Sequence, residues 1–118
     1  MGVFHWPVRL ESMDGARSIE LDAMVDTGAS YTIVPASQLR ELGIVPMDTI
    51  GLVLADGRSV EYEIGEVRAT IDGRTIPTLV VFGDDGARAL LGAYTLEGLR
   101  LAVDPTHRRL IPATTAWA

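Results

Sequence analysis

Four Asp-Gly pairs divide the chain and favour a fold built from short strands. They occur at Asp14-Gly15, Asp56-Gly57, Asp72-Gly73 and Asp85-Gly86. In a β-hairpin this dipeptide favours the tight turn whose residues need a positive φ. Between the pairs, apolar and polar residues alternate with the period of two that is typical of half-buried strands. The pattern therefore predicts a chain of hairpins.

The first three pairs are each predicted to join two strands. Residues 3–12 and 17–25 are expected to pair around the first turn, and two further hairpins follow around the second and third. Residues 78–82 are too continuously apolar for an edge strand, which indicates burial on both faces. Residues 101–103 and 109–111 are predicted to close the sheet.

Two short helices are expected among these strands. Residues 35–42 begin with a proline, which suits a first helical turn, and Gly43 can end the helix. Residues 93–99 form the second candidate. At 118 residues, of which 47% are hydrophobic and 22% charged, the chain has the composition of one globular domain. We therefore predict an all-β fold in a single domain over residues 1–118.

Composition also argues against several classes of function. A net charge of −6 disfavours nucleic acid as a partner, because phosphate binding needs a basic surface. The chain lacks cysteine, and His5 and His107 are in no ligand spacing, so neither a metal nor a cofactor is predicted. We expect a soluble, cytoplasmic protein without a membrane partner, because neither a signal peptide nor a membrane span is evident.

The tripeptide Asp26-Thr27-Gly28 is the main candidate for chemistry. Alone it is a weak signal, since an aspartate in a turn often binds nearby backbone amides. Its context strengthens it, because an apolar strand leads into Asp26 and the apolar pair Ile33-Val34 follows. A second apolar element, Leu90-Leu91-Gly92, precedes the second predicted helix.

This combination resembles the retropepsin-like aspartic proteases, and the resemblance covers nearly the whole chain in order. Residues 24–30 are similar to the active-site loop of that family, the hairpin around Asp56-Gly57 stands where the family has its flap, and residues 90–93 are similar to the motif beneath the loop. The resemblance implies an acid-protease barrel with a flap hairpin and two short helices, active as a two-fold dimer.

The resemblance also implies an activity and its residues. Two carboxylates about 3 Å apart share one proton, which lets one activate water while the other protonates the peptide carbonyl. This chain carries one such motif, so the second Asp26 would come from another copy. Thr27 would link the two loops, and Gly28 would leave room for the water. We therefore expect an aspartic endopeptidase.

Extended peptides or proteins are the substrates that the resemblance implies. The positions similar to substrate-contacting residues are Ala29, Ser30, Ala55, Asp56, Gly57, Arg88 and Leu90. If Asp56 lies over the site, its charge raises the pKa of the carboxylate pair and Arg58 opposes that effect. Ser30 and Ala93 stand where viral members often carry an ion pair between subunits, so this dimer must be held differently.

Alternatives stay open at this point. The same fold could serve as a non-proteolytic peptide-binding or oligomerisation module, or the chain could be a plain β-barrel with a chance Asp-Thr-Gly turn. The hairpin around Asp56-Gly57 could be an ordinary surface hairpin, and Arg88 a solvated loop residue. Trp6 and Trp117 either anchor the dimer interface or cap the subunit's own core.

Overall fold

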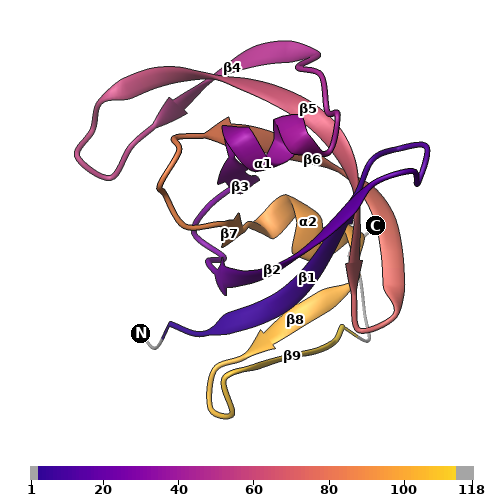
Figure 1. The fold of residues 1–118 in the computed structure, drawn as a ribbon. Helices are drawn as coiled ribbons and strands as arrows, with labels where there is room; N and C mark the ends of the chain where they lie inside the picture. The colour runs from indigo at the N-terminus through magenta and orange to yellow at the C-terminus, as the bar shows by residue number, and fades with distance from the viewer. Residues whose placement is uncertain (1–2, 114–118) are drawn as a thin grey trace.

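A computed structural model describes residues 3–113, in which strands predominate (Figure 1). The all-β prediction with two short helices is confirmed. The elements, in chain order, are β1 (His5–Glu11), β2 (Ser18–Val25), β3 (Thr32–Pro35), α1 (Ala36–Glu41), β4 (Asp48–Val53), β5 (Ser59–Ile71), β6 (Arg74–Gly83), β7 (Leu90–Leu91), α2 (Ala93–Gly98), β8 (Leu101–Asp104) and β9 (Arg109–Pro112).

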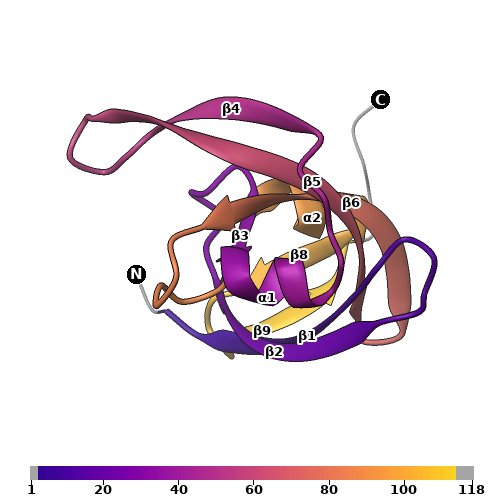
Figure 2. The same ribbon diagram turned by 45° about the horizontal axis from the view of Figure 1, so that its top comes forward.

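Seven strands form one sheet in the order β1-β2-β7-β3-β6-β5-β4, and β1 also pairs with β5. This additional pairing joins Leu10 to Ala69 and closes six of the strands into a barrel. β4 stays outside the ring and pairs only with β5. Together these two strands form a long arm that projects from the barrel (Figures 1 and 2).

The Asp-Gly pairs behave largely as predicted. Asp72 and Gly73 have φ values of 51° and 82° and join β5 to β6 in a two-residue turn. Positive values at both central residues are typical of the primed hairpin turns. The first two pairs also lie in hairpin turns, whereas Asp85-Gly86 lies in the longer loop between β6 and β7.

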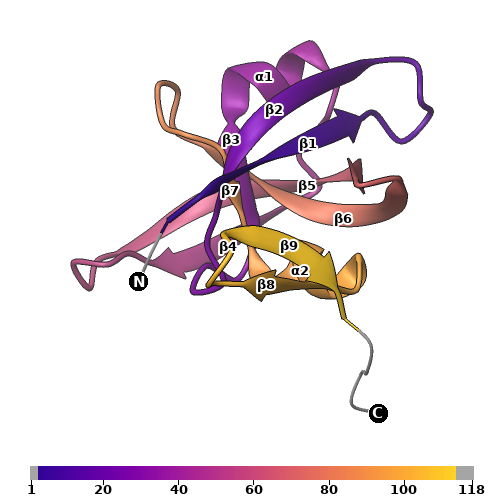
Figure 3. The same ribbon diagram turned by 90° about the horizontal axis from the view of Figure 1, so that it is seen from below.

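The prediction that the last two strands close the sheet is wrong. β8 and β9 pair only with each other, as a separate two-stranded sheet (Figure 3). The main sheet needs no closing strand, because the 13-residue β5 pairs with β4 at one end and with β1 at the other. The β8–β9 hairpin contributes Leu101 and Leu110 to the core instead.

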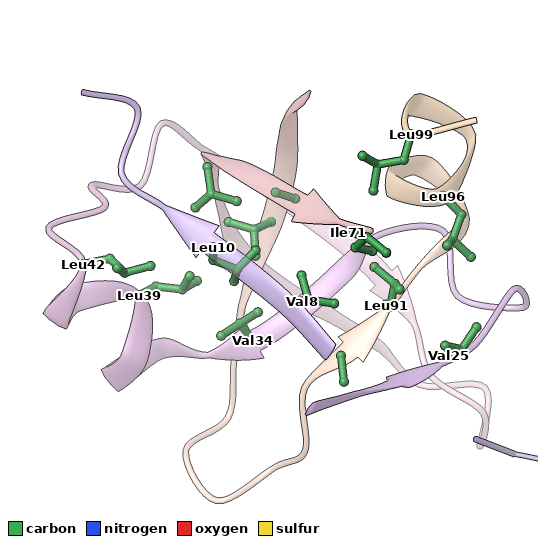
Figure 4. Packing of buried hydrophobic residues seen from close by; sticks show 14 of the residues in the cluster. Val8, Leu10, Val25, Val34, Leu39, Leu42, Ile71, Leu91, Leu96 and Leu99 are labelled. Atoms are coloured by element: carbon green, nitrogen blue, oxygen red, sulfur yellow. The ribbon is translucent and has the colours of Figure 1, made fainter. Parts of the chain in front are cut away.

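The core lies inside the barrel and extends beneath both helices (Figure 4). Leu39 and Leu42 bury one side of α1, and Leu96 and Leu99 do the same for α2. In residues 78–82 all but Leu79 are buried, in agreement with a strand covered on both faces. Neither six-residue helix, nor any other helix in residues 3–113, has the length and apolarity that a membrane span requires.

Candidate active site

Asp26 follows directly on β2 and is half-buried. The last residues of β2 pair with β7 in parallel, with Met24 opposite Leu90 and Val25 opposite Leu91. The backbone N–H of Asp26 then donates to the carbonyl oxygen of Leu91 at 3.0 Å. The strand pairing therefore fixes where the Asp26 side chain leaves the sheet.

The small residues after Asp26 hold its carboxylate in place. The backbone N–H of Gly28 donates to Oδ1 of Asp26 at 2.9 Å, and the N–H of Ala29 donates to the Asp26 carbonyl oxygen at 3.2 Å. A Cβ on Gly28 would lie 3.2 Å from the same Oδ1. This distance is shorter than ordinary van der Waals contact. The Asp26 carboxylate therefore limits the size of the side chain at position 28.

The Asp26 loop (residues 26–30) is also tied to the start of α2. The N–H groups of Ala93 and Tyr94 donate to the carbonyl oxygens of Ala29 and Ser30 at 2.8 and 2.9 Å. Two loops that are distant in sequence therefore form one rigid unit around Asp26.

A buried group of three threonines supports this unit, and the sequence analysis missed it. Oγ1 of Thr95 lies 2.6 Å from Oγ1 of Thr32 and 2.9 Å from Oγ1 of Thr78. Oγ1 of Thr32 also accepts the N–H of Gly92 at 3.2 Å. Thr32 and Thr78 lie in strands, where threonine is common, and Thr95 lies in α2, so no local signal shows that the three side chains meet.

A hollow of about 140 Å³ lies beside the carboxylate. Asp26 and Thr27 line it together with Phe4 from the chain before β1 and Val103 from β8. Thr27 is exposed and has no hydrogen-bond partner within residues 3–113. The segment before β1, the strand β8 and the Asp26 loop thus form one surface.

The other predicted site residues lie apart from this hollow. Ala55, Asp56 and Gly57 form the exposed turn between β4 and β5, where Asp56 pairs with Arg58 (Nε to Oδ2, 2.7 Å). The backbone N–H and the side chain of Arg58 both lower the pKa of Asp56. Asp56 and Arg58 therefore form an exposed ion pair at the tip of this turn.

Arg88 precedes β7, and Leu90 is the first residue of that strand. Leu90 is half-buried in β7, whereas Arg88 is exposed and lines a second hollow with His5, Glu20 and Asp22. Nη1 of Arg88 lies 3.3 Å from Nε2 of His5. Ala29 is half-buried and Ser30 is exposed. Within one chain, Ala29 and Ser30 thus share the loop of Asp26, Thr27 and Gly28, and Leu90 pairs with Met24 just before it. The exposed candidates Ala55, Asp56, Gly57 and Arg88 lie outside this loop.

Trp6 packs against the subunit's own core and meets Phe4 edge to face, with ring centroids 6.2 Å apart. Trp117 lies outside the described residues. Within residues 3–113, no three His, Asp or Glu side chains are arranged to hold a metal ion.

Comparison with known proteins matches the family described as "gag-polyprotein putative aspartyl protease" over residues 14–98. The comparison with curated protein sequences finds no match.

Solved structures of similar fold include three proteases or protease-like domains. Simian foamy virus protease is 22% identical, with a TM-score of 0.53 over 79% of this chain and 93% of that one. EIAV protease, complexed with the inhibitor HBY-793, is 24% identical, with a TM-score of 0.55; the match covers 80% of this chain and 86% of that one. The retroviral protease-like domain of Ddi1 from Leishmania major is 19% identical, with a TM-score of 0.57; the match covers 97% of this chain and 92% of that one.

Proposed function

The chain belongs to the gag-polyprotein aspartyl protease family, and on this premise we propose that it is an aspartic endopeptidase acting as a homodimer. Asp26 of each subunit would supply one of the two catalytic carboxylates. The observation that carries the proposal is the half-buried Asp26 carboxylate, held by the Gly28 N–H in a loop tied to β7 and α2.

The arrangement suits a shared-proton mechanism. With one Asp26 ionised and the other protonated, the ionised carboxylate takes a proton from water as the water oxygen bonds to the peptide carbonyl carbon. The protonated carboxyl gives its proton to the carbonyl oxygen. In the second step the C–N bond breaks, the first carboxyl protonates the leaving nitrogen, and the second recovers a proton from the diol.

The proposal calls for a two-fold dimer because residues 1–118 carry one Asp-Thr-Gly motif. Thr27 is exposed beside Asp26, which suits a residue that meets its symmetry mate. In this proposal Gly28 keeps the space next to the carboxylate free, since a Cβ there would crowd Oδ1. Dimerisation is then a condition for activity.

The β4–β5 arm is suited to act as a flap over an extended substrate. The strand register places Ile50 opposite Tyr62 and Leu52 opposite Val60, all on one face of the arm. These four side chains are half-buried, whereas the opposite face carries polar residues such as Glu61 and Glu63. An apolar face with backbone groups nearby can hold a peptide as an added strand.

The proposed substrate contacts are Ala29, Ser30, Ala55, Asp56, Gly57, Arg88 and Leu90.

The test is cleavage of a diverse peptide mixture between about pH 4 and 7, a range that carboxylate pairs of this kind can span. The chain is compared with Asp26→Asn at matched, high protein concentration. We expect reproducible cuts that vanish in the variant, and a rate per chain that rises with concentration as the dimer forms.

Both proteins must show the same unfolding midpoint for the comparison to count. Cuts that persist in Asp26→Asn would contradict the catalytic assignment. A folded, dimeric chain that binds peptides without cleaving them would instead favour the non-proteolytic module.

A further inference from the structure

Half of the large apolar side chains exposed in residues 3–113 are at positions that the proposed protease would use. Val3 lines the hollow beside Asp26, the backbone N–H of Tyr94 binds the Asp26 loop, and Val53 lies near the tip of the β4–β5 arm. The other half have no role in that proposal. They are Met13, Val45 and Met47.

These three side chains line one groove of about 680 Å³, which we call the hairpin groove. It lies between the β1–β2 turn (residues 12–17), the chain that leaves α1 (residues 42–47) and Glu66 of β5. The turn and this chain lie at the same end of the barrel (Figures 1 and 3). The groove is separated from Asp26 by the length of β2, about 23 Å at ~3.3 Å per residue.

The sheet itself creates the groove. β4 pairs with β5 only as far as Ile64, and β1 pairs with β5 only from Arg68 onward. Residues 65–67 therefore have no strand partner on this edge. The chain after α1 packs over Gly65, where a Cβ would lie 3.0 Å from Ile44, and this packing leaves Val45 77% exposed.

Acidic side chains remain available at the groove. Glu66 forms no ion pair and no side-chain hydrogen bond within the described chain. Asp14 uses Oδ1 to accept from Ser12 and Ala16, at 2.7 and 2.9 Å, and forms no ion pair in residues 3–113, although the nearby Arg17 guanidinium attracts its carboxylate. The one cation of the lining, Arg17, donates to the carbonyl oxygen of Glu41 at 3.1 Å.

We propose that the hairpin groove is a docking site for a polypeptide segment with apolar side chains next to a basic residue. Met13 and Met47 provide an adaptable apolar lining, since methionine suits surfaces that bind varied partners. Asp14 and Glu66 complement the charge of the basic residue. Docking here would hold a partner protein at a distance from Asp26, independently of whether that partner is cleaved.

The test uses a fluorescent synthetic peptide, Gly-Ser-Arg-Leu-Leu-Arg-Ser-Gly, with Asp26→Asn protein so that no cleavage interferes. Control peptides replace both arginines by glutamate or both leucines by serine. We expect anisotropy to show saturable binding of the first peptide, with binding about tenfold weaker or more for each control, a change of roughly 1.4 kcal/mol. Binding should also weaken with added salt.

Variants locate the site. Val45→Asp should weaken binding about tenfold or more, because it places a carboxylate in the apolar lining. Thr75→Asp is the matched control, since Thr75 is exposed on β6 and lines neither the hairpin groove nor the hollow beside Asp26; it should bind as the parent does. Glu66→Gln should reduce both the affinity and its dependence on salt. Met47→Ser replaces Val45→Asp if that variant does not fold.

Amide chemical shifts in NMR spectra give an independent reading. Peptide-induced shifts in residues 12–17 and 42–47 would support the proposal. Shifts confined to the surroundings of Asp26, equal binding by Val45→Asp, or no binding by any peptide would overturn it. None of these results depends on catalysis, so the proposed protease activity stands or fails separately.

Discussion

Gly92 packs directly against the backbone carbonyl of Tyr31, so closely that a Cβ at position 92 would overlap it. This contact joins the end of the Asp26 loop to the start of α2. The N–H of Gly92 also donates to the buried Oγ1 of Thr32. The absence of a side chain at Gly92 is therefore a packing requirement of the active-site unit.

Gly92→Ala should destabilise the fold strongly. The added methyl group meets backbone atoms, which cannot rotate away, and overpacking of this kind costs about 1–3 kcal/mol or more. Urea unfolding monitored by circular dichroism measures the change. Gly51→Ala is the control, because a Cβ there meets nothing within 4 Å. Equal unfolding midpoints for the two variants would contradict the packing argument.

Thr95→Val should cost about 1–3 kcal/mol of the free energy of unfolding. The substitution keeps the shape of the side chain but removes the hydroxyl that lies between Thr32 and Thr78. Their hydroxyls would then stay buried with fewer partners. Thr75→Val is the matched control, because Thr75 shares a 2.7 Å hydrogen bond with Thr70 at the exposed surface. A loss as small as that of the control would show that the buried hydroxyls contribute little.

Local sequence signals predicted much of this molecule. Strand alternation and Asp-Gly turns depend on neighbouring residues, so the hairpins that turn at Gly15, Gly57 and Gly73 followed from the sequence. The Asp26 loop is a weak local signal, and its prediction depends on the apolar segments around it and on the resemblance to the retropepsin-like proteases. The predicted ends of both short helices agree with the structure to within about one residue. Methods that assign helix ends differ from one another by about as much.

Pairing between distant segments could not be predicted in this way. The closure of the barrel pairs Leu10 with Ala69, and nothing near either residue specifies that register. The bond between Thr32 and Thr95 spans 63 residues, and the contact between Arg88 and His5 spans 83. Such contacts depend on the packing of the whole sheet.

Asp104 should make stability depend on pH in the acid range. Hydrogen bonds from His107 (2.8 Å) and Arg109 (3.1 Å) lower the pKa of Asp104 from 3.8 to about 2. A carboxyl group with a lower pKa in the folded chain adds stability above the unfolded pKa. That contribution is lost as the pH falls through the folded pKa. The contribution of Asp104 is therefore complete above about pH 5 and lost toward about pH 2.

Asp104→Asn isolates this effect from the other carboxylates. The difference in unfolding free energy between parent and variant should be constant above about pH 5 and should shrink steadily between about pH 4 and 2. Denaturant unfolding at a series of pH values measures it. A difference that stays constant down to pH 2 would show that Asp104 titrates normally in the folded chain.

Gly28→Ala should affect activity more than stability. Gly28 is exposed, and its φ is not among the positive values of the chain, so the fold can accept alanine within about 1 kcal/mol. The added Cβ would lie 3.2 Å from Oδ1 of Asp26 and would displace either the carboxylate or the N–H that binds it. Small displacements of reacting groups lower rates by up to about 100-fold. We therefore expect kcat/KM to fall at least about tenfold with little change in unfolding midpoint.

Ala29→Gly serves as the comparison, because it changes the neighbouring residue without crowding the carboxylate. It keeps the backbone bonds from Ala29 to Asp26 and Ala93, so its effect reports loop flexibility alone. If the two variants lose activity equally, the rate depends on the rigidity of the loop. If only Gly28→Ala loses activity, the space beside Asp26 is what the reaction requires.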